Sequence, residues 1–282
     1  MISNLINSHD ICFFIEHWLG AEEAHYFNEI IDKHSIIFSA DFERSTLKKG
    51  RPFGGTCWVI SDSFKICEKT TLSSSVSKIV IDGQNIDKTT IFGLWQPFDD
   101  GSQNKLALLQ STISLLEIEI ENLNGQDYVI MRDFNADFNR SNRFDLLFKQ
   151  LLIKLNMFDL AYSYECDLTP TYAKGTYSST IDHIWVSDHM IHKIIDFKIV
   201  SHPADASDHR PISCQIRSVS TNIDYKTLLL RIREDIDFHG NLTSSERNMR
   251  MILIKKFNHC QKSVIIFQHA HIFKTFILNY QD

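Results

Sequence analysis

The sequence predicts an α/β protein with a mixed β-sheet up to about residue 217. Three observations support this prediction. Short apolar or alternating runs of strand length recur along this part of the chain. Two longer stretches between them have apolar residues at helical spacing. After residue 217 the strand-like runs stop, so we expect one domain over residues 1–217 and a helical C-terminal extension over residues 218–282.

The expected strands are short, and several are bounded by glycine or proline. They cover residues 10–15, 54–60, 76–82, 89–95, 128–131, 184–186 and 212–216. The run from Asp10 to Ile15 is continuously apolar after its first residue, which is typical of a buried strand. Val76 to Asp82 alternates apolar and polar residues, as a strand with one polar face does. Pro97 ends the fourth strand, because proline cannot donate to a sheet.

Five helices are expected. Apolar residues at helical spacing predict the first two, Leu106–Leu123 and Phe144–Leu155, within the α/β part of the chain. The other three, Tyr225–Asp235, Arg247–Phe257 and Ser263–Tyr280, make up the predicted extension. The extension therefore reads as an appended helical segment and not as a continuation of the sheet.

Composition sets the broad class of the protein. The chain has 282 residues, 43% of them hydrophobic, with 29 Lys and Arg against 35 Asp and Glu and a net charge of −6. These values exclude a wholly disordered chain, and they provide no overall electrostatic attraction for nucleic acid. Any such binding must come from a local site.

The cysteines and the apolar runs predict the compartment. Six cysteines are scattered without a C-x-x-C pair, which favours buried reduced thiols in an intracellular protein. No apolar run is long enough to span a bilayer, and Met1 to Asp10 lacks the basic start of a signal peptide. We therefore expect an intracellular protein without a membrane partner.

Three clusters of ionisable residues stand beside predicted strands. Glu16 follows the first strand, Asp133 and Asn135 follow the strand at 128–131, and Asp208-His209 precedes the strand at 212–216. Strand ends allow distant carboxylates to converge on one point, and a group of carboxylates suits Mg²⁺. Asp beside His suits proton transfer near neutral pH.

Each cluster also has a purely structural interpretation. Asp-x-Asn is a common turn composition, Glu16 alone would usually be a solvated strand end, and Ser207-Asp208-His209 could simply cap a loop. The co-occurrence of all three clusters favours a site, together with Asp182-His183 between the second and the third.

Five motifs in this order resemble the endonuclease/exonuclease/phosphatase family. They are Glu16–Leu19, Gly50–Gly55, Asp133–Asp137, Ser179–His183 and Ser207–Pro211. Within that family the chain looks most like the apurinic-endonuclease-like domain of non-LTR retrotransposons. The resemblance covers about the first three-quarters of the chain.

The resemblance implies a fold and a metal. The fold would be a four-layer α/β sandwich, in which two sheets pack face to face with helices outside. The metal would be Mg²⁺, with Mn²⁺ as a substitute, and Glu16 and Asp208 match the positions that bind or assist it. The substrate implied is DNA, which places an active protein in the nucleus if it cuts chromosomal DNA. No partner protein can be deduced.

The resemblance also implies catalytic roles. Asp133 would orient and activate the attacking water, and Asn135 would contact the scissile phosphate. His209 would stabilise charge on the phosphate or transfer a proton, and Asp182 would fix the tautomer of His209.

The chain departs from the family pattern in three places. The first strand of the family, which carries a metal-binding Asn, has no counterpart before residue 10. Trp95 stands where the family has a Tyr, and its indole N–H is the donor it offers to a phosphate. Arg132 replaces a Gly beside Asp133, where it either crowds the site or adds a phosphate contact. Arg51, in a small basic loop, is a candidate DNA contact, although a solvated turn explains it equally well.

These residues lead to one hypothesis and two alternatives. The leading hypothesis is a metal-dependent DNA endonuclease that nicks one strand. The first alternative is a non-catalytic relic of the same fold, favoured by the missing strand and Arg132. The second is a phosphoesterase that acts on small phosphoesters.

Overall fold

The computed structural model describes residues 2–25, 31, 33–40, 54–83, 86–96, 98–164, 169–200, 207–217 and 262–269. Within these residues the chain forms two six-stranded sheets and a separate two-stranded hairpin. The order of strands in the first sheet is β12-β13-β14-β1-β3-β2. In the second sheet it is β4-β5-β6-β7-β11-β8.

The strands of the first sheet come from both ends of the chain. They are β1 (Ile11–Ile15), β2 (His34–Ser39), β3 (Thr56–Ser61), β12 (Ile194–Ile199), β13 (Ile212–Arg217) and β14 (Lys262–His269). The strands of the second sheet come from its middle: β4 (Phe64–Ser73), β5 (Val76–Gly83), β6 (Ile86–Trp95), β7 (Tyr128–Asp133), β8 (Met157–Asp159) and β11 (Asp182–Ser187). The hairpin consists of β9 (Tyr172–Lys174) and β10 (Tyr177–Ser179).

The two longest helices in the described part of the chain are α3 (Gln103–Glu121) and α4 (Arg143–Lys154). Shorter helices are α1 (Ile2–Ser8), the 3-10 turn Ala21–Glu23, α5 (Leu160–Ser163) and α6 (Asp188–Ile191). Side chains cap both long helices at their amino ends. The Ser102 hydroxyl accepts from Lys105 N at 3.3 Å at the start of α3, and Asp145 accepts from Asn142 N at 2.8 Å at the start of α4.

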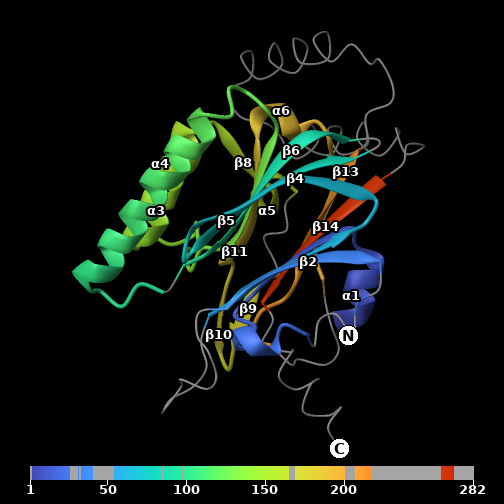
Figure 1. The fold of residues 1–282 in the computed structure, drawn as a ribbon. Helices are drawn as coiled ribbons and strands as arrows, with labels where there is room; N and C mark the ends of the chain where they lie inside the picture. The colour runs from blue at the N-terminus through green and yellow to red at the C-terminus, as the bar shows by residue number, and fades with distance from the viewer. Residues whose placement is uncertain are drawn as a thin grey trace, which may run out of the picture.

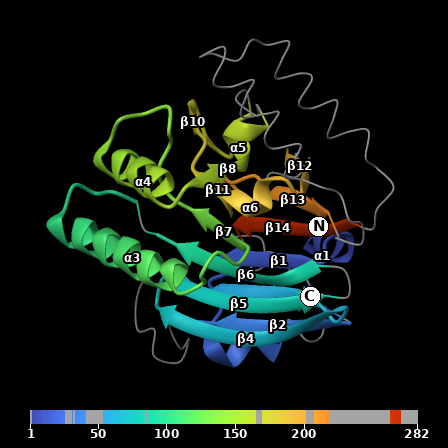
Figure 2. The same ribbon diagram turned by 90° about the horizontal axis from the view of Figure 1, so that it is seen from above.

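Three apolar clusters define four layers. The largest lies between the sheets and joins Phe13 and Trp58 of the first sheet to Ile91 and Met131 of the second. A second cluster packs α3 and α4 on the outer face of the second sheet, and a third packs α1 on the outer face of the first. Figures 1 and 2 show α3 and α4 at one side of the molecule and α1 at the other. The predicted four-layer α/β sandwich is confirmed.

The strand β1 is buried on both faces, which explains why its sequence does not alternate apolar and polar residues. Ile11, Phe13 and Ile15 belong to the cluster between the sheets, whereas Cys12 and Phe14 belong to the cluster under α1. A strand with packed layers on both faces needs apolar residues at every position. Opposite it, Gly93 of β6 leaves room for the rings of Phe13 and Trp58, since a Cβ at this residue would lie 2.5 Å from both.

The seven predicted strands and the two predicted helices before residue 217 are present, with ends moved by a few residues. The prediction of a helix at the end of the chain is wrong over residues 263–269. Lys262–His269 is a strand, β14, and not the start of the helix expected at Ser263–Tyr280. The expected helices at Tyr225–Asp235 and Arg247–Phe257 lie outside the described residues.

The strand β14 lies in the middle of the first sheet. This strand lies between β13 and β1, antiparallel to the first and parallel to the second. The first sheet is therefore continuous from β12 to β2. In Figure 2, β14 and β1 run side by side through the middle of the sheet.

Among the described helices, none combines the length and apolarity that a bilayer crossing requires.

Candidate active site

Three of the predicted site residues meet at one edge of the sandwich. Asp133 ends β7 and Asp182 begins β11, and the two residues are direct partners in the antiparallel pairing of these strands. His209 precedes β13 and forms a single bridge with Tyr172. One ligand atom from each of Asp133, Asp182 and His209 lies within 4.8 Å of the others. Residues far apart in the chain thus form one buried polar cluster.

The contact between His209 and Asp182 defines the protonation of the ring. Nδ1 of His209 lies 2.9 Å from Oδ2 and 3.2 Å from Oδ1 of Asp182. A carboxylate accepts, so Nδ1 carries the proton, and Nε2 is the ring atom at which His209 would exchange a proton. Burial acts to lower the pKa of His209, but the charge and hydrogen bond of Asp182, with Asp133 and Glu16 nearby, raise it to about 9.

Asp133 determines the conformation of Asn135. The Asn135 backbone N–H donates to Asp133 Oδ1 at 2.8 Å, and its Nδ2 donates to Asp133 Oδ2 at 3.1 Å and to the Gln96 carbonyl at 2.8 Å. These bonds support a φ of 48° at Asn135, a left-handed conformation that Asn tolerates. Burial raises the pKa of Asp133, although the charge of His209 and the bond from Asn135 act in the opposite direction.

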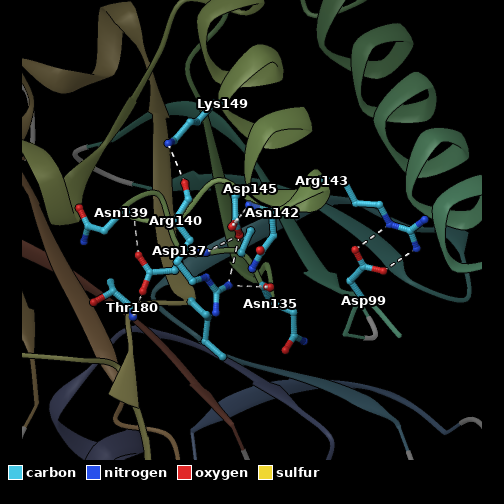
Figure 3. A network of polar contacts seen from close by, with 12 residues as sticks. Asp99, Asn135, Asp137, Asn139, Arg140, Asn142, Arg143, Asp145, Lys149 and Thr180 are labelled. Atoms are coloured by element: carbon cyan, nitrogen blue, oxygen red, sulfur yellow. Dashed lines mark hydrogen bonds and ion pairs between the residues drawn. The ribbon is translucent and has the colours of Figure 1, made fainter. Parts of the chain in front are cut away.

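A network of polar contacts supports the loop that follows Asn135 (Figure 3). Asp145 accepts from the backbone N–H of Asp137 at 2.9 Å, and Asp137 accepts from Thr180 N at 3.0 Å. Arg140 connects the two sides, because its Nη2 lies 3.2 Å from Asp145 Oδ1 and 3.4 Å from the Asn135 carbonyl. The network links the loop to α4 and to the segment before β11, so Asn135 has a rigid support.

The other predicted site residues lie at different distances from the cluster. Glu16 directly follows β1 and is close enough for its charge to raise the pKa of His209. Trp95 pairs in register with Asp133 and packs partly against the core between the sheets. Asp208 is exposed, and its Oδ2 forms an ion pair with Lys174 Nζ at 2.9 Å, outside the cluster. Arg51 lies outside the described residues.

Two residues that sequence reasoning missed position the His–Asp pair. The Thr171 hydroxyl accepts from the backbone N–H groups of Ile181 and Asp182, both at 3.0 Å. The Tyr172 ring lies 4.8 Å from that of His209 at an interplanar angle of 64°. The sequence feature that could have pointed to Thr171 and Tyr172 is the polar run after Pro170. A run of this kind usually marks a loop, so it does not indicate a site.

Arg132 points away from the site. Its guanidinium carbon lies 4.4 Å from the ring centre of Phe134 and 4.1 Å from that of Phe148, in the layer between the second sheet and α4. The side chain is fully buried, and neither Nη atom has a hydrogen-bond partner among the described residues. The alternatives in which Arg132 crowds the site or contacts phosphate are therefore wrong, since residues 132 and 133 of a strand face opposite sides of the sheet.

We expect Arg132→Met to raise the free energy of unfolding by about 1–4 kcal/mol, because methionine fills a similar volume without a buried, unsatisfied guanidinium. Urea unfolding followed by circular dichroism measures the difference. Arg143→Met is the control, because Arg143 is half-exposed and donates from Nε to Asp99 at 2.7 Å. This control should be neutral or slightly destabilising. An equal gain in both variants would contradict the burial argument.

The His209–Asp182 ion pair should make stability depend on pH in a defined direction. The folded-state pKa of His209, about 9, lies above its ordinary value of 6.5. The pair therefore stabilises the fold fully below pH 6.5, and this contribution is lost as the pH rises through about 9. In metal-free protein, the difference in unfolding free energy between the parent and Asp182→Asn should shrink between pH 6 and pH 10. Titration of the His209 ring by NMR gives the pKa directly, and a value near 6.5 would contradict the geometry.

Two of the three residues of the cluster have the oxygen ligands that a hard divalent cation prefers. Asp133 and Asp182 offer carboxylate oxygens, which Mg²⁺ and Mn²⁺ prefer, and the charge of Glu16 reaches the same cluster. Asp182 accepts from His209 and both oxygens of Asp133 accept from Asn135, so a cation bound within the cluster would share these oxygens with their present donors. The buried Asp133 carboxylate has a raised pKa, and a cation beside it would favour its charged form.

Part of the chain, including most of the candidate site, matches a known family model. Residues 99–213 match the family model described as endonuclease-reverse transcriptase. The matched region includes Asp133, Asn135, Asp182 and His209. No curated protein matches the chain.

Solved structures with the same architecture include nucleases and phosphatases. An AP endonuclease from Archaeoglobus fulgidus has a TM-score of 0.58 at 14% identity and covers 75% of this chain and 91% of its own. The endonuclease domain of TRAS1, a telomere-specific non-LTR retrotransposon, has a TM-score of 0.52 at 13% identity and covers 74% and 86%. The 3′ phosphatase NExo from Neisseria, bound to a product DNA hairpin, has a TM-score of 0.55 at 16% identity and covers 76% and 92%.

Proposed function

We propose that this chain is a metal-dependent phosphodiester hydrolase acting on DNA. The premise is its endonuclease/exonuclease/phosphatase fold. The observation that carries the proposal is the convergence of Asp133, Asp182 and His209, with ligand atoms within 4.8 Å of one another. Such a cluster combines a charged imidazole with carboxylates, as the hydrolysis of a phosphodiester requires.

Each residue has a chemical task in this proposal. Asp133 accepts a proton from the attacking water, and the raised pKa of its buried carboxyl makes it a stronger base. His209, charged and oriented by Asp182, donates from Nε2 to a phosphate oxygen as negative charge develops there. A bound divalent cation would polarise the phosphate and lower the pKa of water, and Glu16 and Asp208 are the carboxylates that would hold it, which leaves Asp133 to act as the base.

Two of the proposed contacts require a local exchange of partners. Both N–H bonds of the Asn135 amide are used, one by Gln96 and one by Asp133, so contact with the scissile phosphate would replace one of them. Asp208 would assist the metal after release from Lys174. Both groups lie in the same part of the molecule as His209, and a phosphate offers the charge that such exchanges need.

Cleavage of a supercoiled plasmid tests the proposal. Purified protein with Mg²⁺ or Mn²⁺ should convert the supercoiled form into the nicked circle, which is the product of a single-strand nick. His209→Ala should abolish the conversion, and EDTA should stop it. A second substrate, an oligonucleotide duplex with one abasic site, reports on nicking at a lesion.

Each alternative predicts a different result in the same assay. A non-catalytic relic gives no product at any Mg²⁺ or Mn²⁺ concentration, while its unfolding remains cooperative. A phosphoesterase for small substrates releases phosphate from inositol phosphates faster than it nicks DNA. Turnover measured on both substrates with the same preparation therefore decides between the three.

A further inference from the structure

A buried histidine directly follows Glu16. The side chain of His17 is fully buried, and its ring stacks on that of Phe38 with 4.4 Å between the ring centres. Nδ1 of His17 accepts from the backbone N–H of Leu19 at 3.1 Å, and Nε2 lies 3.0 Å from the Ser39 carbonyl, which can only accept. The ring is therefore the neutral tautomer with its proton on Nε2. Its bond to Ser39 joins the turn after β1 to the end of β2.

The backbone on both sides of His17 has a conformation that needs support. Glu16 has a φ of 51° and Trp18 a φ of 57°, in the left-handed region that residues other than glycine rarely enter. The backbone N–H of Glu16 donates to the Gly55 carbonyl at 2.8 Å, and that of Trp18 donates to the Gly54 carbonyl at 3.3 Å. Such conformations persist where the surrounding structure holds them, and they are frequent at functional sites.

The His17 ring fills the space over Gly55. A Cβ on Gly55 would lie 2.5 Å from Nε2 and 2.8 Å from Nδ1 of that ring, so a larger residue would displace the ring. Gly55 also has a φ of 89°, which glycine adopts without strain. The turn after β1 is thus fixed between the His17 ring and the residue that precedes β3.

We propose that His17 is a positioning residue that fixes Glu16 beside the cluster of Asp133, Asp182 and His209. This inference rests on the proposed function, in which Glu16 helps to hold the divalent cation. Glu16 follows a strand of the first sheet, whereas Asp133 and Asp182 belong to strands of the second. A residue whose backbone is already fixed loses less conformational freedom when it binds a cation, so the affinity is higher.

Mn²⁺ binding to the purified chain, measured by calorimetry, tests the role of the ring. His17→Ala removes both hydrogen bonds and should weaken Mn²⁺ binding about 10–100-fold, the usual loss when a group that supports a metal ligand is removed. His17→Asn keeps an acceptor for the Leu19 N–H, as in an Asx-turn. Its affinity should therefore lie between those of the parent and His17→Ala.

Plasmid nicking separates positioning from catalysis. Excess Mn²⁺ should restore the rate in both His17 variants, because Asp133 and His209 are unchanged and only the affinity for the cation is lower. A loss that saturating Mn²⁺ does not restore would contradict the positioning role. His34→Ala is the control, since His34 lies at the opposite end of β2 from Ser39, and it should keep the parental affinity and rate.

Amide hydrogen exchange, followed by NMR, reports on the turn without metal or DNA. The amides of Glu16 and Trp18 should exchange about tenfold faster in His17→Ala than in the parent, because the turn opens more often without the ring. The amides of β13 should exchange at the parental rate. Unchanged exchange at Glu16 and Trp18 would overturn the proposal.

The outcomes separate this inference from the proposed function. If the parent nicks DNA and folded His17→Ala binds Mn²⁺ with the parental affinity, the proposed function stands and the role of His17 is wrong. If the parent neither nicks DNA nor binds Mn²⁺, the proposed function fails, and the exchange rates still decide whether His17 fixes Glu16. If His17→Ala does not fold, His17→Asn decides, and parental affinity and exchange in that variant overturn the proposal.

Discussion

Asp182→Asn should lower the rate of the proposed cleavage by about 10³–10⁴-fold, the loss expected when a buried carboxylate can no longer orient a catalytic histidine. Asp182 accepts from Nδ1 of His209 at 2.9 Å, and the charge of Asp182 raises the pKa of that ring. An asparagine amide can present its N–H to Nδ1, which then becomes the acceptor and shifts the proton to Nε2. The imidazolium needed to offset phosphate charge is lost.

Single-turnover nicking at pH 7.5 measures this effect, with urea unfolding as a check that the variant folds. Asp196→Asn provides the control, because Asp196 is partly exposed and pairs with Lys198 at 2.8 Å, far along β12 from His209. The control should keep the parental rate. A variant Asp182→Asn that retains more than a tenth of the parental rate would contradict the assigned role.

The second large effect concerns a buried His–Asp pair on the other face of β11. Asp159→Ala should lower the free energy of unfolding by about 3–5 kcal/mol, the loss observed when one partner of a buried ion pair is removed. Asp159 Oδ2 lies 2.6 Å from His183 Nδ1 and accepts from Trp185 Nε1 at 3.1 Å. Its Oδ1 accepts from Ala161 N at 2.9 Å.

The charge on His183 makes this loss large. Nε2 of His183 lies 3.1 Å from the Ala136 carbonyl, which can only accept. Nδ1 faces the Asp159 carboxylate, so both ring nitrogens carry protons. Burial acts to lower the pKa of His183, but Asp159 overcomes this and raises it. Without Asp159 the ring must lose a proton or remain charged without a partner, and either change destabilises the fold.

Urea unfolding at pH 7 compares Asp159→Ala with Asp196→Ala, whose partly exposed ion pair should contribute less than about 1 kcal/mol. Equal losses in the two variants would show that burial does not determine the strength of the pair.

The two faces of β11 show what the sequence could and could not predict. Asp182 and His183 are adjacent, so strand alternation places them on opposite faces. Resemblance to a family assigned Asp182 to His209, and the structure brings them together. Nothing in the sequence indicated that His183 pairs with Asp159, because that contact depends on the packing of β8 beside β11.

Strands and helices with a clear period were predictable, and so was the convergence of Asp133, Asp182 and His209. The strand β14 was not. Its apolar residues 264–267 form a run without alternation, which cannot be distinguished from a buried helix by period alone. Asp208 shows a second limit, since a motif predicts the position of a residue along the chain and not the ion pair that its side chain forms with Lys174.

The pairing of Ile11 with Ile265 also affects how the chain is made. A ribosome releases β1 long before β14 exists, so the edge of β1 that pairs with β14 lacks this neighbour until about 250 further residues have been added. Edges of this kind invite association with other chains, and contacts between distant residues form slowly. Nascent molecules would therefore depend on chaperones until β14 emerges, and yield in a cell should respond to chaperone supply.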